Sequence, residues 1–359
     1  MPGVYRFLAY DLRTNVALGE LPLSGVSFGG TFNGSGVFNA NLVIDGNAAL
    51  MMSATIPERT IVYVERDNVL LDGYIIWKRT RTMGAPVKLE GASSASFFRR
   101  NRLITDITYT STDQFTIARA LVTAMQVQPG GNIGIAVGSG NSGVTRDRTY
   151  FGYQRKNVGD AFAELANVVN GFDWAIDVAW DDDTPVKNLT LSYPRRGRIA
   201  GTTGLIFETG KNLRSYSFEE DGSRSARVVD ALGAGDGKDM LISTKARTDL
   251  IDAGWPLTAE TIAFKDVTVQ ATLDGHATAA VNARAATPTF LTVSIDPDDV
   301  DGGLGHWIDG DDVQVRISDD LFPGTSDGPG YTAYHRIVSH TVDLKAGEKV
   351  DVVLAQVAA

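Results

Sequence analysis

The sequence contains no cysteine and no long apolar run. The absence of cysteine excludes disulfides, thiolate metal sites and cysteine nucleophiles. No stretch is long enough to span a bilayer, and the N-terminus lacks a basic segment followed by an apolar one. We therefore expect neither a membrane span nor a signal peptide, and a chain that stays in the cytoplasm where it is made unless lysis releases it.

Positive charge is also scarce. The chain has 33 Lys and Arg against 43 Asp and Glu, giving a formal net charge of -10 and a pI near 4.9. Neutralising phosphates requires clustered cations, so the composition argues against specific nucleic-acid binding. An acidic wall can nevertheless line a conduit through which DNA passes without being retained.

What the chain does have is typical of a well-buried globular protein. Of its 359 residues, 43% are hydrophobic and 21% are charged, and this length suggests two to four domains. The 38 glycines fall between apolar segments, a pattern that suits many tight turns. These features predict a mainly β protein.

A set of three strand-like segments occurs near each end of the chain. Each segment alternates apolar and polar residues and is rich in Val, Ile and Tyr. The repeat predicts two similar antiparallel β-barrel domains, and a trimer of such a chain would present six similar domains in a ring that can dock onto a sixfold tube. The segments are residues 60–66, 71–77 and 86–91, and residues 312–317, 334–339 and 348–354.

Helices are predicted between the two sets. Ser111 and Gln114 have capping-box spacing, and Asn157 can cap a second helix that ends at Asn170 and Gly171. The fold class is thus mainly β with α+β insertions. The predicted domains are residues 1–105 (first β-barrel, tube-docking), 106–211 (α+β), 212–244 with 287–359 (second β-barrel), and 245–286 (a small insertion with an alanine-rich helix at 277–286).

Two glycine motifs match catalytic patterns but lack their context. Residues 138–143 match GxGxxG, yet the following segment is extended instead of starting a helix, which favours a loop. Residues 324–328 match GxSxG around Ser326, but Pro323 and Pro329 deny the strand and helix that a nucleophile elbow needs. We therefore predict no catalytic serine and no enzyme activity.

The acidic and aromatic residues are candidates for metal and sugar binding. The aspartates lack EF-hand spacing and are interpreted as solvated turns, although Ca²⁺ binding is left undecided, and nothing indicates a carboxylate pair for glycoside hydrolysis. His335 and His340 are five apart, so a regular strand would place them on opposite faces, away from a shared metal; the other histidines are His276 and His306. No catalytic, cofactor or metal site is predicted. The aspartates are Asp296, Asp298, Asp299, Asp301, Asp309, Asp311 and Asp312; Trp77, Trp174 and Trp255 are expected in the core, and Trp180 and Trp307 on the surface.

Three parts of the chain, in order, resemble one family. The opening YRFLAYDLR at residues 5–13 resembles the start of minor tail proteins from actinobacterial siphophages. Residues 157–166, followed by 170–174, resemble the helix-then-strand signature of phage tail-hub proteins. Residues 310–315 and 334–337, with the Val-rich terminal strand, resemble the closing barrel of the same group.

The resemblance implies a baseplate-hub fold with two similar β-barrels and two smaller domains. It implies a homotrimer at the tail tip that joins the sixfold tail tube and distal ring to the threefold tip and forms part of the DNA-ejection channel. The implied partners are the distal tail ring, tail tip or fibre proteins and the tape measure protein. The implied role is structural, without a cofactor or an appended hydrolase, in a virion tail assembled in the host bacterial cytoplasm.

Two alternatives remain open. A hexameric distal tail protein would carry one tube-docking β-domain per chain, which the repeat disfavours. A carbohydrate-binding or glycan-degrading β-protein would need an exposed aromatic platform or a carboxylate pair in a cleft.

Overall fold

The computed structural model describes residues 3–44, 46–202, 204–285, 289–326 and 328–357. Contacts between residues divide the chain into two compact units. The larger unit comprises Met1–Ala163, Phe172–Ser217 and Thr292–Ala359, and the smaller comprises Glu164–Gly171 and Phe218–Leu291. The division into four domains given above stays a prediction.

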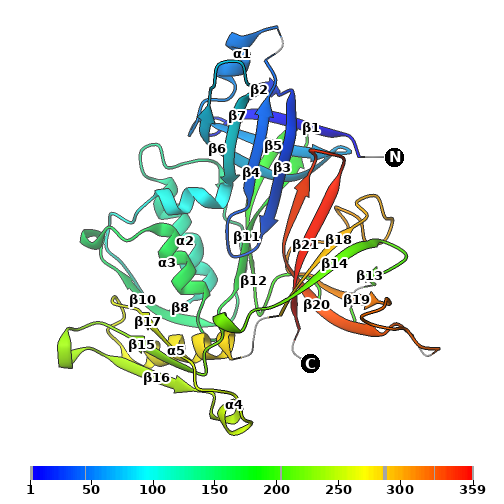
Figure 1. Ribbon diagram of the computed structural model, residues 1–359. Helices are drawn as coiled ribbons and strands as arrows, with labels where there is room; N and C mark the ends of the chain where they lie inside the picture. Colours follow the sequence, from blue (N-terminus) through cyan, green and yellow to red (C-terminus); the bar gives the residue numbers. More distant parts are fainter. Residues whose placement is uncertain (1–2, 45, 203, 286–288, 327, 358–359) are drawn as a thin grey trace. The chain divides into compact units, whose positions relative to one another are not determined.

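The N-terminal strands form the first strand set, with pairing order β1-β5-β6-β7-β4-β3 and β2 beside β1 (Figure 1). Every pair in this set is antiparallel. The segment predicted at residues 60–66 is β5. The bounds are β1 Tyr5–Asp11, β2 Ala17–Glu20, β3 Leu23–Thr31, β4 Val37–Leu42, β5 Thr60–Arg66, β6 Val69–Thr80 and β7 Val87–Ser93, with helix α1 at Ala48–Ser53 and the 3₁₀ helix η1 at Ser94–Arg100.

The C-terminal strands form the second strand set, with pairing order β13-β19-β20-β21-β18-β14. β13 runs parallel to β19, while β19, β20 and β21 form an antiparallel meander. The segment predicted at residues 312–317 is β19. The bounds are β13 Ile206–Glu208, β14 Leu213–Glu220, β18 Thr289–Ile295, β19 Asp312–Ile317, β20 Tyr331–Asp343 and β21 Lys349–Gln356.

The two strand sets repeat one another in chain order and in pairing order. β3, β4, β5, β6 and β7 correspond in turn to β14, β18, β19, β20 and β21. The first strands differ in direction, because β1 is antiparallel to β5 and β13 is parallel to β19. Even an irregularity is repeated, because β6 bulges at Trp77 against β7 and β20 bulges at Val338 against β21. The repeat predicted from three strands in each set therefore extends to five.

The bulges also fix the alignment of the neighbouring strands. Two residues before the bulge, Ile75 of β6 pairs with Ile61 of β5. At the same place in the second set, Arg336 of β20 pairs with Asp312 of β19. Residue n of β6 thus corresponds to residue n + 261 of β20, since both neighbours agree on the same register.

The two sets are joined edge to edge. Residues 27–31 of β3 pair with residues 339–343 of β20, which makes one 13-stranded sheet (Figure 1). The mainly β architecture is confirmed, but pairing among the described strands closes neither set into a barrel. The edge strand β3 pairs with the other set instead of with β1 of its own, and this is why the predicted closure does not occur.

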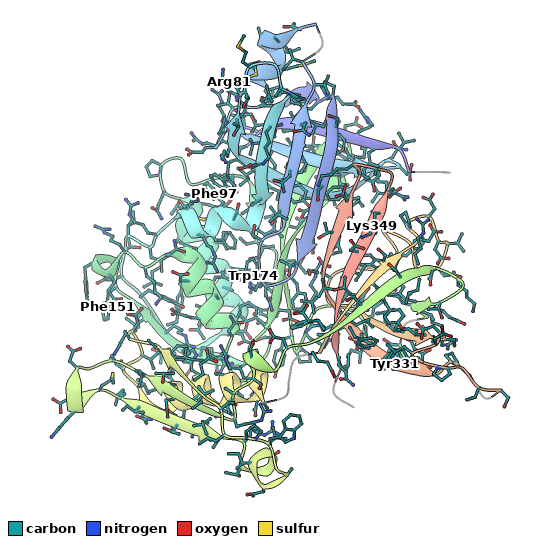
Figure 2. The ribbon with its side chains drawn as sticks, viewed as in Figure 1. Arg81, Phe97, Phe151, Trp174, Tyr331 and Lys349 are labelled. Atoms are coloured by element: carbon teal, nitrogen blue, oxygen red, sulfur yellow. The ribbon has the colours of Figure 1, made fainter. Side chains whose placement is uncertain are left out.

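An α/β segment lies between the two sets in the sequence. In its core, Phe162 packs against Phe98, at a ring-centroid distance of 5.4 Å, and edge-on against Trp174, at 4.8 Å. Figure 2 labels Trp174. β8 pairs with β10, and β11 and β12 form a hairpin with β9 beside β12. The bounds are β8 Ile107–Asp113, α2 Gln114–Gln126, β9 Ile135–Ala136, β10 Thr145–Tyr150, η2 Gly152–Gln154, α3 Val158–Ala166, β11 Asp173–Asp181 and β12 Thr184–Ser192.

One of the two predicted helix caps in this segment is confirmed. Asn157 caps α3, because its Oδ1 accepts a hydrogen bond from the Gly159 amide at 2.9 Å. The cap of α2 is Asp113 and not Ser111, since the Asp113 carboxylate accepts from the Phe115 amide at 2.9 Å. Ser111 lies inside β8, which runs up to the start of the helix.

The smaller unit holds a three-stranded sheet covered by α5. β15 is the central strand, antiparallel to β16 and parallel to β17. Leu273 and Ala277 of α5 pack with Ala231, and Val281 packs with Val229. The alanine-rich helix begins before the predicted residue 277, while Ala286 lies outside the described residues. The bounds are η3 Gly222–Arg224, β15 Val228–Leu232, η4 Gly237–Asp239, β16 Ile242–Ala246, α4 Thr248–Asp252, β17 Ala259–Ala263 and α5 Gln270–Arg284.

No helix in the described part of the chain is both long enough and apolar enough to cross a membrane.

A lysine is buried where the β11–β12 hairpin meets β5. Lys187 is 2% exposed, and its Nζ donates to Tyr63 Oη at 3.0 Å. Burial lowers the pKa of Lys187 to about 8. Because the folded pKa lies below the unfolded value, the stability linked to this group is complete at high pH and is lost as the pH falls through about 8.

Replacing this lysine by methionine should stabilise the fold at neutral pH. Near pH 7 the buried cation costs on the order of 2–3 kcal/mol, so Lys187→Met should raise the free energy of unfolding by about 1–2 kcal/mol. The gain should shrink as the pH rises and vanish above about pH 11, where the lysine is neutral in both states. Urea denaturation across this range measures both effects, and Tyr63→Phe, which keeps the lysine, should show no gain. A Lys187→Met protein less stable than the parent at neutral pH contradicts the argument.

Candidate functional site

Neither glycine motif forms the site that its pattern would allow. The GxGxxG segment at residues 138–143 lies in the loop between β9 and β10, so no helix N-terminus follows it. The GxSxG segment lies in the loop between β19 and β20, with Asp327 outside the described residues. The interpretation of both motifs as loops is confirmed.

Most of the acidic segment before β19 is engaged by arginines and a histidine. Asp311 and Asp312 are 1% and 0% exposed, and Asp309 pairs with His340. The prediction of solvated turns is wrong for these three, although Asp301 is exposed. Within the described residues, no group of three or more His, Asp or Glu is placed to hold a metal ion.

The bulge at Val338 also overturns the prediction for two histidines. His335 pairs with Gln356 and His340 with Val352, and these even-numbered residues of β21 share one face. The extra residue of the bulge therefore brings both histidines to the same side of β20. Their partners differ, because His335 bonds Tyr331 Oη at 2.7 Å and His340 bonds Asp309 at 2.9 Å.

Two of the five tryptophans occupy the opposite environment from the one expected. Trp255 is 48% exposed, whereas Trp307 is only 6% exposed. Trp307 is buried because its indole N–H donates to the Gly302 carbonyl at 3.1 Å and its ring packs edge-on against His340. Trp174 is buried as predicted, while Trp77 and Trp180 are half-buried.

The candidate functional site is the joint between the strand sets, where β3 pairs with β20. A Cβ on Gly29 would lie 2.2 Å from the His340 carbonyl oxygen. A Cβ on Gly30 would lie 2.7 Å from His340 Cε1 and 2.8 Å from Asp309 Oδ2. Only glycine allows this approach, so the joint depends on two positions without side chains.

A histidine and two carboxylates lie beneath the joint. His340 Nδ1 is 2.9 Å from Asp309 Oδ1. Burial alone would lower the pKa of His340, but the charges of Asp309 and Asp72 outweigh it and raise that pKa. Burial raises the pKa of Asp72 to about 7, against a hydrogen bond from the Gly73 amide at 2.6 Å. Protonation of this group therefore changes near neutral pH.

A second contact ties the end of β5 to the turn between β20 and β21. Arg66 Nε donates to Glu348 Oε1 at 2.9 Å, and the same guanidinium pairs with Asp298. Tyr5 Oη donates to Glu348 at 2.6 Å. Glu348 and Arg66 are largely buried, so this contact is shielded from solvent screening.

A third contact ties the segment after β12 to the start of β19. Its backbone approach requires Gly197, which has φ of +87° and whose Cβ would lie 2.2 Å from the Gly310 carbonyl carbon. Arg336 of β20 pairs with Asp173 of β11 at the same place. The pairs of this arginine segment are Arg195 with Asp312, Arg196 with Asp177 and Arg198 with Asp311.

Sequence reasoning missed these ionic contacts. The available signal was the run Pro-Arg-Arg-Gly-Arg at residues 194–198, opposite in charge to the acidic run at 309–312. The aspartates are interpreted above only as metal ligands or solvated turns, so no partner is predicted for the arginines. The charged side chains of the site pair with one another, and these pairs hold the two strand sets and the β11–β12 hairpin together.

A cleft of about 540 Å³ lies beside this segment. It is lined by charged residues of both signs, including Glu208, Lys211 and Asp301, and by His306. None of its described lining residues is Trp, Tyr or Phe. It therefore lacks the aromatic platform that a carbohydrate-binding protein would need.

The comparisons with known proteins give a fold but no sequence family. No family model and no curated protein sequence matches the chain. A tail protein from Neisseria meningitidis MC58 matches with a TM-score of 0.60 at 14% identity, over 98% of this chain and 96% of its own. The 43 kDa tail protein of prophage MuSo2 from Shewanella oneidensis matches with a TM-score of 0.61 at 10% identity, over 98% of both chains.

A prophage tail protein, gp18 from Listeria monocytogenes EGD-e, matches with a TM-score of 0.53 at 13% identity, over 98% of this chain and 94% of its own. The matches span nearly the whole length of each protein, so the likeness includes both strand sets and both units. At these identities they establish a shared fold. The chain has the fold of prophage tail proteins.

The buried aspartate at the start of β19 should be important for stability. Asp312 accepts from Arg195 at 3.0 Å and from the Ala200 amide at 2.7 Å. Asp312→Ala removes both acceptors and leaves a guanidinium without its partner, so the free energy of unfolding should fall by about 3 kcal/mol. Denaturant titration measures this, and Asp301→Ala, in the same acidic region but exposed, should stay within about 0.5 kcal/mol of the parent. Equal effects of the two substitutions would argue that the pair contributes nothing specific.

The group beneath the joint should give a pH-dependent stability. The folded pKa values of Asp72 and His340 are both raised, so their stability is present at low pH and is lost as the pH rises through those values. Asp72→Asn removes the contribution of Asp72 to this pH dependence. Relative to the parent, its free energy of unfolding should rise by on the order of 1–2 kcal/mol between about pH 5 and about pH 8. A difference from the parent that stays flat across this range would show that Asp72 ionises normally, and Asp301→Asn is the exposed control.

Proposed function

We propose that this chain is the structural hub subunit of a phage tail, acting as a homotrimer. The observation that carries the proposal is the duplicated strand set, five corresponding strands in each half, joined edge to edge by β3 and β20. Three such chains present six similar sets, and closed rings are the common outcome of repeated head-to-tail contacts. The fold shared with prophage tail proteins supports the proposal.

A ring of this kind would join two symmetries. Six similar sets suit a sixfold tail tube and distal ring, and three chains suit a threefold tip. The proposed partners are the distal tail ring, tail tip or fibre proteins and the tape measure protein of a long-tailed phage of the actinobacterial siphophage type. The proposed location is the virion tail tip, with assembly in the host bacterial cytoplasm.

The proposed ring encloses part of the channel through which DNA leaves the virion. The excess of acidic residues supports passage without retention, because like charges repel the phosphates. The role would be structural and not enzymatic. The polar groups of the joint support this view, because they are committed to one another and to holding strands.

The duplication weighs against a hexameric distal tail protein. Such a protein would supply one tube-docking set per chain, so that six chains would give six sets. This chain carries two sets joined within one body, and six copies would present twelve.

The mass of the purified chain in solution tests the proposal. Light scattering after gel filtration should give three times the chain mass of 38.5 kDa, and negative-stain images should show rings with six similar lobes. The interfaces of such a trimer are expected to be large, so the trimer should persist at micromolar concentration. A hexamer would favour the distal ring, and a monomer that forms no ring with tail partners would count against the hub.

A further inference from the structure

Inside one chain, β3 of the first set pairs with β20 of the second. The corresponding strands with the sets exchanged, β14 and β6, are not neighbours in the described sheet. β20 pairs with β19 through residues 331–336, and with β3 through residues 339–343 further along the same edge. In β6, the pairing with β5 ends at Ile75. From Ile76 to Thr80, β6 has only β7 as a partner among the described strands.

The counterpart of β3 also lies at an edge. β14 ends the strand order of the sheet, next to β18. Its sequence follows that of β3, with Leu23, Ser27 and Phe28 matched by Leu213, Ser217 and Phe218. In β3, Val26 and Phe28 are buried, and their counterparts Tyr216 and Phe218 in β14 are half-buried between exposed neighbours. Residue n of β3 therefore corresponds to residue n + 190 of β14.

We propose that β14 of one copy pairs with the end of β6 of the next copy, as β3 pairs with β20 inside each chain. The strands run antiparallel, as they do in the internal joint. This inference rests on the proposed trimer and names the contact that builds it. It is a head-to-tail contact between different surfaces, which repeats around a ring and closes after three copies.

The alignment of the two sets predicts the register. In the internal joint, Gly30 pairs with His340 and Gly29 with Thr341. The corresponding residues between copies place Glu220 opposite Arg79 and Glu219 opposite Thr80. The joint between copies is thus expected to share the strand direction and register of the internal joint, with its backbones further apart, because Glu219 and Glu220 have Cβ atoms where Gly29 and Gly30 have none.

Charge complementarity supports this register. The end of β6 carries Lys78 and Arg79, and Arg81, labelled in Figure 2, follows directly after the strand. β14 ends with Glu219 and Glu220, both exposed. Opposite charges on facing strands stabilise pairing, whereas two acidic or two basic edges repel. Each edge is thereby kept from pairing with its own kind and directed to the other.

The two joints cannot be identical in atomic detail. Gly29 and Gly30 admit the close approach of His340 and Asp309, whereas Glu219 and Glu220 carry side chains. Arg79 replaces His340, and its Nη1 is already held by the Met52 and Thr55 carbonyl oxygens at 2.6 and 2.9 Å. We therefore expect an ion pair of Arg79 with Glu220 in the joint between copies, at the position where Gly30 faces His340 in the internal joint.

Cysteine cross-linking tests the contact, because the natural chain has no cysteine to interfere. One chain carries Thr80→Cys and a second carries Glu219→Cys, and the two are mixed, assembled and oxidised. Directly opposed residues on antiparallel strands have Cα atoms about 4.5–5.5 Å apart, within disulfide range. We expect a cross-linked pair containing one chain of each kind. The matched control replaces Glu219→Cys with Ser215→Cys, which lies four residues away on the same strand and should not cross-link.

The outcomes separate this inference from the proposed function. A trimer by light scattering without the Thr80–Glu219 cross-link overturns the joint between copies and leaves the trimer standing. Equal cross-linking at Ser215 overturns the register. A chain that remains a monomer and does not cross-link overturns both proposals.

Charge reversal provides a second readout that needs no disulfide. Glu219→Lys with Glu220→Lys should weaken the trimer at least tenfold, because two basic edges would then face each other. The thermal midpoint of the dilute monomer should be unchanged, which separates an assembly defect from misfolding. A trimer with undiminished affinity would contradict the proposed contact.

Discussion

The rest of the structure depends on the close approach of β3 to β20 at Gly29 and Gly30. Main-chain pairing there makes one sheet out of two strand sets, and no side chain could be accommodated between the strands. A sheet transmits orientation through hydrogen bonds that are short and directional, so the angle between the sets is set by backbone geometry. A flexible linker between two closed barrels would leave that angle free, whereas this joint fixes it within each chain.

The buried charges around the joint contribute specificity more than net stability. Desolvation offsets much of the attraction in pairs such as Arg195 with Asp312 or Arg66 with Glu348, and well-packed apolar residues could stabilise the same contacts at least as well. Apolar contacts, however, tolerate sliding, while a paired guanidinium and carboxylate have one good geometry. Such pairs tie β5 to the turn before β21 and the segment after β12 to the start of β19, so they favour one arrangement of these strands.

The sequence predicted those features that depend on local patterns. Residues 60–66 and 312–317 were identified as strands because apolar alternation and bounding turns are sufficient, and Asn157 was identified as a cap because capping is local. Most of the wrong predictions involve partners distant in the chain, and the cap of α2, which is Asp113 and not Ser111, is a local exception. A bulge at Val338 reverses the face of His340, a long-range pairing prevents barrel closure, and the ring of Trp307 packs against His340 of β20. The arginine run at 194–198 acquires its role only when the fold brings it to Asp311 and Asp312.

The duplication is interrupted between β14 and β18, and this interruption would give the proposed ring a threefold character. In the first set, β3 and β4 are joined by a turn of residues 32–36, whereas the corresponding β14 and β18 are separated by most of the smaller unit. Six sets around such a ring would have similar strands, but only every second set would carry the smaller unit as an insertion. The strands can present a repeated surface to a sixfold partner, while the insertions, occurring at every second position, can present only three equivalent surfaces. In the proposed ring, a chain with a doubled set of strands and one insertion in its second set would thereby convert six similar sets into three equivalent surfaces.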